Sequence, residues 1–267
     1  MLDSLYLYSH YLSISIRSQM QYQTSFILLL VGSFLSTGLE FVGVIVLLNR
    51  FHHLQNWNLP EVALFYAIVN ISFSLCDMTM GSFVGFPNLL KTGEFDRFLL
   101  RPRSALLQLM TQQLTLNRLG RLLLGFAVLL WTGLTLHLVW SPAKILFTGL
   151  TILGGASFFL GLIILQATLS FWTIESLEIL SIVTYGGVET AQYPLTIYQP
   201  WFRRFFTFVI PLAGVSYYPI LVILERSDPL GSSAIAQYLS PSIGFLFLWI
   251  CLKIWQFGLR HYRSSGS

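Results

Sequence analysis

Long apolar runs, each about as long as a membrane is thick, dominate this sequence. They occupy residues 25–48, 62–86, 122–140, 145–170 and 239–259, and charges such as Glu40, Asp77 and Lys253 interrupt them only singly. A hydrocarbon core of roughly 30 Å needs about 20 apolar residues in a helix. Backbone polar groups inside that core must also be hydrogen-bonded within the protein. The runs therefore predict spanning helices, and the expected fold class is an all-α polytopic membrane protein.

The composition supports this class and excludes others. The chain of 267 residues is 55% hydrophobic and 10% charged, with a mean hydropathy of +0.70, whereas a soluble domain has about 25% charged residues. Its 22 Phe, 12 Tyr and 7 Trp suit aromatic belts at membrane interfaces. Membrane lipid is therefore an expected partner, and the net charge of +4 does not point to nucleic acid. Cys76 and Cys251 lie inside apolar runs, which predicts neither a disulfide framework nor a metal cluster.

The first 24 residues lack the pattern of a cleavable signal peptide, because the first apolar run begins late and is too long. Leu2, Leu5, Tyr6, Leu12 and Ile16 alternate there with polar residues. This pattern predicts an interfacial helix over residues 1–24. A polar lead-in without stable structure remains the alternative.

Basic residues set the expected orientation, because they accumulate on the cytoplasmic side. With a cytoplasmic N-terminus, only Arg50 and Lys144 lie outside in the unambiguous loops. The basic residues that then lie inside are Arg17, Lys91, Arg97, Arg101, Arg103, Arg118, Arg121, Arg260 and Arg263. We therefore expect a multi-pass protein of the cell membrane with both termini cytoplasmic and an even number of crossings.

An even number requires one further crossing between residues 171 and 231, for which two segments compete. Hydropathy favours residues 205–224. The rival, residues 177–195, contains Glu178, Glu189 and Gln192. If the rival crosses, residues 205–224 enter the outer leaflet and turn back, which Pro211 and Pro219 allow because each removes a backbone donor.

A charged segment after the second apolar run carries a recognisable set of motifs. Residues 91–103, KTGEFDRFLLRPR, include Gly93, Asp96 and the triplet 100–102, Leu-Arg-Pro. Residues 185–219 add Gly-Gly, Tyr-Pro, a Trp followed by Arg, Ile-Pro-Leu-Ala and Tyr-Tyr-Pro. In this order and spacing, the chain resembles the type-2 permeases of ATP-binding-cassette (ABC) exporters, and within them the daunorubicin-resistance-like branch. The resemblance extends from the first apolar run to Arg263.

This resemblance implies a permease of six transmembrane helices in the bacterial inner membrane, with an extracellular re-entrant hairpin between spans five and six. It favours residues 177–195 as the fifth span and residues 200–224 as the re-entrant region. It also implies a dimer, in which the second permease subunit is a copy or a related chain.

Transport in this family is driven by ATP, yet the sequence contains no G-x-x-x-x-G-K-[ST] loop to cradle phosphates. We therefore expect the chain to bind no cofactor and to have no catalytic residues, with ATP and Mg held by cytoplasmic ABC ATPase subunits. Residues 91–103 are then expected to form a short amphipathic coupling helix that inserts into a groove on the ATPase. A solvated loop of basic residues is the alternative. The residues expected to couple are Glu94, Phe95, Asp96, Arg97, Phe98, Arg101 and Pro102.

Acidic residues inside the expected spans are the other candidate site. Glu40, Asp77 and Glu189 are each costly in lipid unless paired, and the sequence places no Lys or Arg deep in the membrane beside them. A substrate-lining role and a helix-to-helix hydrogen bond both remain open. Glu175 and Glu178 are expected to mark the cytoplasmic turn between spans four and five.

Enzyme and metal chemistry have little support in the sequence. The five histidines are scattered at ends and loops without a nucleophile beside them. His52 and His53 beside Glu61 form a conceivable metal site, although paired histidines without further ligands are usually only polar. We therefore expect no metal.

The function expected is a permease subunit that exports a hydrophobic or amphipathic molecule, such as a lipid, drug or glycoconjugate. The alternative is an ion-coupled secondary transporter that uses Glu40, Asp77 and Glu189 as proton relays. Such a transporter predicts internal inverted repeats, and no convincing repeat is visible in the sequence.

Overall fold

The computed structural model of the chain describes residues 13–14, 17–18, 20–51, 54–79, 81–112, 115–173 and 177–262. The described residues form helices, turns and loops, with one isolated bridge between Leu54 and Trp57. Most of the expected interfacial helix lies outside the described residues, so its prediction stays open.

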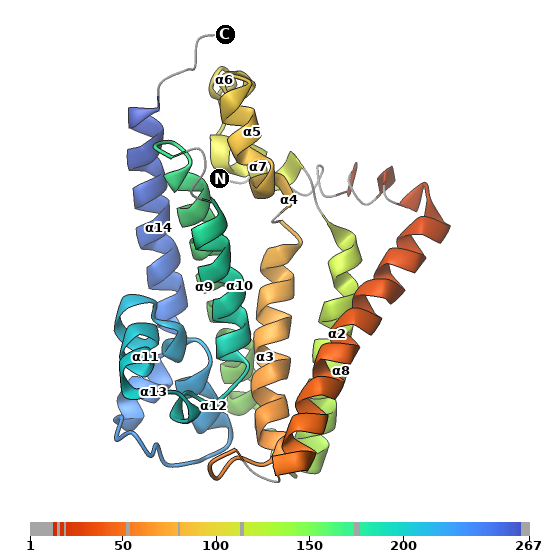
Figure 1. Cartoon of the computed structure of the whole chain (residues 1–267), viewed down its shortest axis with the longest axis vertical. Helices are drawn as coiled ribbons and strands as arrows, with labels where there is room; N and C mark the ends of the chain where they lie inside the picture. The colour runs from red at the N-terminus through yellow and green to blue at the C-terminus, as the bar shows by residue number, and fades with distance from the viewer. Residues whose placement is uncertain are drawn as a thin grey trace.

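Long helices run side by side to form the bundle in Figure 1. They are α2 (Gln23–Phe51), α3 (Leu59–Asp77), α8 (Leu119–Thr135), α9 (Pro142–Leu169), α10 (Leu177–Ala191) and α14 (Ser242–His261). All of them except α10 are long and apolar enough to cross a membrane. Helix α2 begins and α14 ends at the same end of the bundle. The all-α polytopic fold class is confirmed.

Short helices cover the two ends of the bundle. One end, here named the charged end, carries α4 (Gly81–Val84), α5 (Phe86–Lys91), α6 (Asp96–Leu99), α7 (Ala105–Gln112) and η1 (Leu116–Arg118). The other, here named the hairpin end, carries η2 (Leu195–Ile197), α11 (Pro200–Arg204), the π-helical η3 (Phe205–Val209), η4 (Leu212–Gly214), α12 (Tyr217–Ile223) and α13 (Ala234–Leu239).

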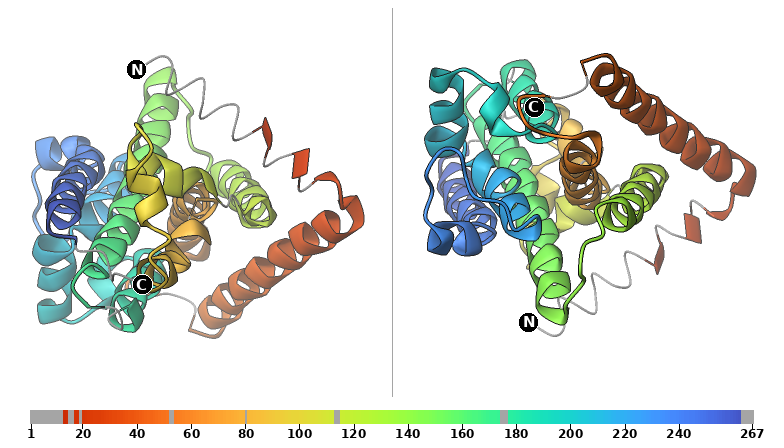
Figure 2. Two further views of the ribbon diagram at one scale, coloured as in Figure 1. Left: turned by 90° about the horizontal axis from the view of Figure 1, so that it is seen from above. Right: turned by 90° about the horizontal axis from the view of Figure 1, so that it is seen from below.

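The core of the bundle lies around α3 and α9. The most extensive packing joins α9 to α14, followed by the packing of α3 on α8 and α9. Glycines allow the closest approach: a side chain on Gly244 of α14 would meet the backbone of Gly154 in α9. Helix α2 lies at the edge of the bundle and contacts mainly α8 and η1 (Figure 2). Its apolar side chains, such as Leu28 and Leu39, are therefore largely exposed.

Several expected boundaries are corrected by the structure. The second span ends at Asp77 rather than at residue 86, because the chain turns at Met78 and Thr79 before the short α4. Pro87 lies in the first turn of α5, and a proline there interrupts a continuous helix. The third span ends at Thr135 rather than 140. The last span begins at Ser242 rather than 239.

The expected coupling helix over residues 91–103 is also corrected. Helix α5 ends at Lys91, and Gly93 turns the chain with a φ of +70°, which favours glycine. Only Asp96–Leu99 then form a helical turn, α6. Two short helices joined by a tight turn therefore replace one amphipathic helix.

The arrangement of the helices favours one of the two segments that compete as the fifth span. Helix α10 packs against α9 and α3 and extends from the charged end to the hairpin end (Figure 1). Residues Pro200–Val209 and Leu212–Ile223 instead form a pair bent by 77°, and both arms lie at the hairpin end. This arrangement favours residues 177–195 as the fifth crossing and 200–224 as a re-entrant region. The crossing itself stays a prediction.

Candidate functional site

The charged end carries a group of exposed side chains, here named the tip, next to a cluster of buried aromatic side chains. The tip consists of Glu94, Arg97 and residues 100–103. The side chains of Glu94, Arg97, Leu100 and Arg101 are exposed, and Leu100 is 86% exposed, unusually for a leucine. Pro102 and Arg103 are exposed as well. An apolar side chain surrounded by charges at the end of a membrane protein is typical of a surface that meets another protein. The tip therefore remains the candidate coupling surface.

Phe95 faces the opposite way and is fully buried. Its ring lies 5.1 Å from that of Phe86, 5.9 Å from that of Phe171 and 5.2 Å from that of Tyr262. Trp255 of α14 packs 5.2 Å from Phe171 and completes this aromatic cluster. The expectation that Phe95 offers an apolar contact to a partner is therefore wrong. The ring instead joins the tip to the ends of α9 and α14.

Two further residues of the segment are tied to the bundle. The Tyr262 hydroxyl donates a hydrogen bond to the Asp96 carboxylate at 3.1 Å. Phe98 is half-buried, and the Gln108 side chain donates to its carbonyl oxygen at 3.0 Å. These hydrogen bonds connect the segment to α7 and to the end of α14.

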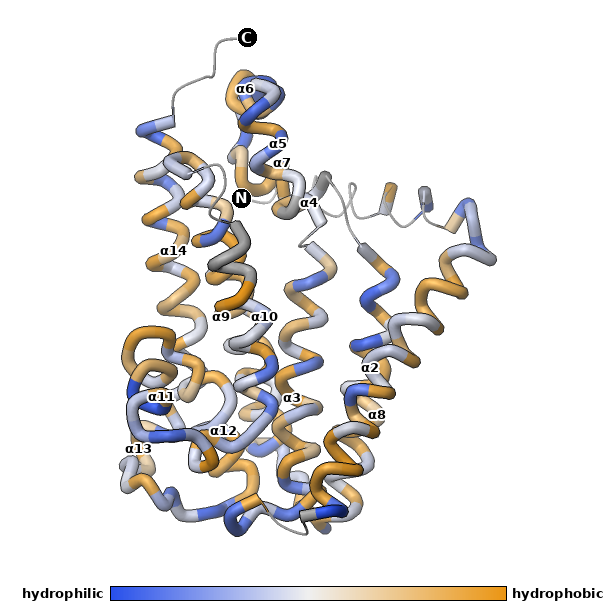
Figure 3. The backbone as a smooth tube through the Cα atoms, in the orientation of Figure 1, coloured by the Kyte–Doolittle hydropathy of each residue, from blue (hydrophilic) through white to orange (hydrophobic). Residues whose placement is uncertain are grey.

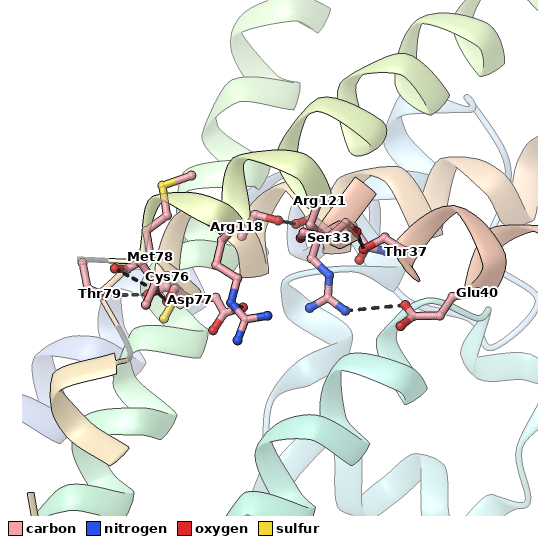
Figure 4. A network of polar contacts seen from close by, with 12 residues as sticks. Ser33, Thr37, Glu40, Cys76, Asp77, Met78, Thr79, Arg118 and Arg121 are labelled. Atoms are coloured by element: carbon pink, nitrogen blue, oxygen red, sulfur yellow. Dashed lines mark hydrogen bonds and ion pairs between the residues drawn. The ribbon is translucent and has the colours of Figure 1, made fainter. Parts of the chain in front are cut away.

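Two of the three intramembrane acids, Asp77 and Glu40, are paired, contrary to the sequence-based expectation. The Arg118 Nε atom lies 3.0 Å from the Asp77 carboxylate, and Arg121 lies 3.5 Å from the Glu40 carboxylate (Figure 4). The expectation of unpaired acids failed because the third span was taken to begin at Leu122. The helical segment begins at Leu116, which places both arginines inside it.

Glu189 stands apart from these two pairs. It has no ion-pair partner among the residues that the structure describes, and it lies on an exposed stripe of α10. Ile182, Tyr185 and Gly186 share this stripe at helical spacing. An unpaired carboxylate is too costly to face lipid. The stripe is therefore suited to a polar path or to a second subunit.

Arg226 forms the largest set of charged contacts described at the hairpin end. The sequence did not indicate this role. One guanidinium nitrogen donates to both Glu61 carboxylate oxygens, at 3.0 and 3.1 Å, and the other donates to the Asn56 carbonyl at 2.8 Å. The guanidinium also lies 4.2 Å from the Trp57 ring centre. These contacts join the residues that follow α12 to the loop between α2 and α3 and to the first turn of α3.

Lys144 provides a second fastening at this end. It donates a 2.7 Å hydrogen bond to Glu225, and this bond and its charge hold the pKa of Glu225 below the usual value. Both Glu61 carboxylate oxygens accept hydrogen bonds from Arg226. Glu61 therefore already has a partner other than the metal ion considered from the sequence. His52 and His53 lie outside the described residues. Within the described residues, no three His, Cys, Asp or Glu side chains gather as a metal site would require.

Sequence reasoning thus missed the residues that act through distant partners: Arg118, Arg121, Phe171, Arg226, Trp255 and Tyr262. One local signal was available for two of them. Arg118 and Arg121 stand three residues apart at the start of an apolar run, which places both on one helix face.

Comparison with known proteins supplies one match. A family model described as "ABC-2 family transporter protein" matches residues 34–266. No curated protein matches the chain, and no solved structure matches it.

Proposed function

The chain belongs to the ABC-2 family of transporter proteins, and from this membership we propose that it is the membrane-spanning permease subunit of an ATP-driven exporter. A separate cytoplasmic ATPase binds ATP and Mg and hydrolyses the nucleotide. A second permease subunit, identical or related, completes the translocation path. Both termini face the cytoplasm, and the substrate is a hydrophobic or amphipathic molecule such as a lipid, drug or glycoconjugate.

The observation that carries this proposal is the exposed tip anchored by a buried aromatic cluster. Leu100 and Arg101 are free to contact an ATPase, while Phe95 connects the same short segment to α9 and α14. Packed aromatic side chains resist compression. A rigid displacement of the tip on ATP binding is therefore transmitted to the membrane helices rather than absorbed in the loop.

Co-purification with the ATPase tests the contact. We expect Leu100→Asp combined with Arg101→Glu to abolish association, because the pair loses its apolar contact and reverses its charge. The matched control, Leu230→Asp with Arg204→Glu, introduces the same changes at exposed positions of the hairpin end and should leave association intact. Unchanged association of the tip variant contradicts the proposal.

Phe95→Ala separates contact from transmission. The variant leaves Leu100 and Arg101 in place, so the ATPase still associates, but the aromatic cluster loses a fully buried ring. Such a truncation costs about 3 to 5 kcal/mol and loosens the tip from α9 and α14. We expect substrate transport to fall while ATPase association persists. Normal transport by a folded Phe95→Ala protein contradicts the transmission step.

A further inference from the structure

Arg118 and Arg121 are two cations at the start of the candidate span Leu116–Thr135, and their hydrogen-bonding groups are largely unused. Arg118 Nε is buried, and although it lies 3.0 Å from Asp77, its N–H does not point at the carboxylate closely enough for a hydrogen bond. Arg121 makes a single contact with Glu40 at 3.5 Å, the outer limit for a hydrogen bond. Each guanidinium carries five N–H groups, so most donors of this pair have no partner among the described residues.

Both guanidinium groups project from the same side of the segment that begins α8 (Figure 4). The Arg118 side chain is 42% exposed, which leaves it accessible to a ligand, whereas the Arg121 side chain is 16% exposed. The Arg121 guanidinium lies 5.4 Å from the ring centre of Phe73 on α3, and this contact fixes its orientation. Two neighbouring guanidinium groups, each with paired N–H donors, match the oxygen geometry of a phosphate or carboxylate.

The carboxylates around the pair do not satisfy it. Asp77 is 5% exposed, and its carboxylate lies 3.0 Å from Arg118. Glu40 is 44% exposed and lies on α2, the least buried of the candidate spans. Glu189, whose charge reaches Glu40 and Arg121, forms no ion pair with either arginine. Glu40 is therefore the one contact that an incoming anion has to displace.

The surroundings of the pair are apolar and open to lipid. Apolar residues run along both helices that carry the Arg121–Glu40 contact (Figure 3): Leu35 and Leu39 on α2, and Leu123 and Phe126 on α8, expose between 43% and 72% of their surface. An amphiphile whose head meets the two arginines can lay its hydrocarbon chains along these side chains. A free anion gains nothing from this apolar surface, so the site favours an anion attached to a lipid chain.

We propose that Arg118 and Arg121 bind the phosphate or carboxylate headgroup of an anionic amphiphile, and that Glu40 holds the site until the headgroup displaces it. This inference rests on the proposed export function and specifies the substrate as an anionic amphiphile. The ligand opens the Arg121–Glu40 ion pair, while α2 and α8 stay joined by their close packing at Gly120.

Binding to purified protein in a neutral detergent tests the proposal. The probe is dioctanoyl phosphatidic acid. Dioctanoylglycerol has the same chains without the phosphate, and inorganic phosphate has the anion without the chains. Affinity is measured from the shift in thermal unfolding with ligand concentration. We expect phosphatidic acid to bind and the other two to bind at least about tenfold more weakly. Dioctanoylglycerol loses the charge-assisted hydrogen bonds to the arginines, whereas inorganic phosphate loses the burial of the acyl chains. Equal binding of inorganic phosphate overturns the lipid source, and equal binding of dioctanoylglycerol overturns the anion site.

Charge variants identify the residues. Arg121→Gln and Arg118→Gln should each weaken phosphatidic acid binding by about tenfold or more. Arg260→Gln, which removes an exposed arginine at the end of α14, is the control for general attraction and should bind normally. Equal weakening by Arg260→Gln overturns the specific site.

Glu40→Gln keeps the proposal testable if an arginine variant fails to fold. This change removes the competing carboxylate and leaves both guanidinium groups in place. We therefore expect phosphatidic acid to bind several-fold more tightly. Misfolding does not produce tighter binding. Unchanged or weaker binding by folded Glu40→Gln protein overturns the displacement step.

The arginine variants also separate this inference from the proposed function. Leu100 and Arg101 lie outside η1 and α8, so Arg121→Gln protein should still associate with the ATPase. Retained association with lost lipid binding supports the headgroup site. Lipid binding by a wild-type chain that associates with no ATPase leaves the headgroup site standing and contradicts the proposed function instead.

Discussion

Arg226 and Arg121 each lie beside a carboxylate and an aromatic ring, but their surroundings differ. Arg226 reaches both oxygens of Glu61 and a backbone carbonyl, and it lies 4.2 Å from Trp57. Arg121 has one 3.5 Å contact with Glu40. A guanidinium with several short contacts stabilises a structure, whereas one with a single long contact can exchange it for a ligand. We therefore assign Arg226 to stability and Arg121 to binding.

Arg226→Gln should destabilise the hairpin end. The change removes the two hydrogen bonds to Glu61 and leaves a half-buried carboxylate without a cation. We expect a loss of about 2 to 3 kcal/mol in the free energy of unfolding, the size of hydrogen bonds to charged groups. Thermal unfolding in detergent measures it. Arg204→Gln, at an exposed position, is the matched control, and equal stability of the two variants contradicts the assignment.

Asp228 should make the stability of the hairpin end depend on pH. Burial raises the pKa of Asp228, but hydrogen bonds from Ser232, Leu230 and Tyr217 outweigh it and hold the pKa below the ordinary value of 3.8. A carboxylate with a lowered pKa stabilises the folded state above its unfolded pKa, and that stability is lost as the pH falls through the folded pKa.

We therefore expect Asp228→Asn to unfold at a lower temperature than the wild type at pH 7. The difference should shrink as the pH falls below about 4, where the wild-type carboxylate becomes protonated. Unfolding midpoints of both proteins across this range test the expectation. A difference that is independent of pH indicates that Asp228 contributes only through its shape.

At the scale of the elements, close helix packing is concentrated in α3, α9 and α14. Gly154, Gly155 and Gly161 on α9 each face a neighbouring chain segment so closely that a side chain would collide. Small residues of this kind let membrane helices approach and gain dispersion contacts. Helix α2 lacks such packing along most of its length. Movement between α2 and the rest is therefore easier than movement within the core.

Gly244→Ala tests this difference in packing. Its added methyl group would meet the backbone of Gly154, which cannot rotate away. We expect a loss of about 1 to 3 kcal/mol, the usual cost of overpacking. Gly149→Ala adds a methyl group on α9 where nothing lies within 4 Å. That control should be neutral or stabilising by up to about 1 kcal/mol. Equal effects of the two changes on thermal unfolding contradict the close α9–α14 contact.

At the scale of the whole molecule, the two ends have different roles. The charged end exposes Glu94, Leu100 and Arg101, which we propose contact the ATPase, whereas the hairpin end joins its own segments through Arg226 and Lys144. Arg118 ends η1 and Arg121 lies in the first turn of α8, so the arginine pair lies next to the charged end. An amphiphile taken up there is moved toward the hairpin end when the proposed export cycle runs.

A cysteine at Gln199 distinguishes the two topologies. With α10 as the fifth crossing, Gln199→Cys is labelled by a membrane-impermeant maleimide from outside intact cells, and Leu100→Cys is labelled only after the membrane is opened. If residues 205–224 cross instead, Gln199→Cys behaves like Leu100→Cys. Background labelling is low, because Cys76 and Cys251 are both buried. Labelling of Gln199→Cys only after opening contradicts the α10 crossing.

The sequence alone determined the class of the molecule and the location of the five described helices that are long and apolar enough to cross a membrane. Hydropathy is a sum over neighbouring residues, so apolar runs such as 145–170 identify a helix without knowledge of its partners. The same locality explains the errors. The end of the second span at Asp77 depends on a turn, and the orientation of Phe95 depends on which helices close over it.

Only the tertiary structure decided which charges meet. Arg121 and Glu40 are separated by 81 positions along the chain, and Arg226 and Glu61 by 165. The energy of such a pair depends on distance and burial, and neither follows from position in the sequence. The sequence therefore showed which helices carry acidic residues that require a partner. The packing of the helices decided which of them pair with an arginine.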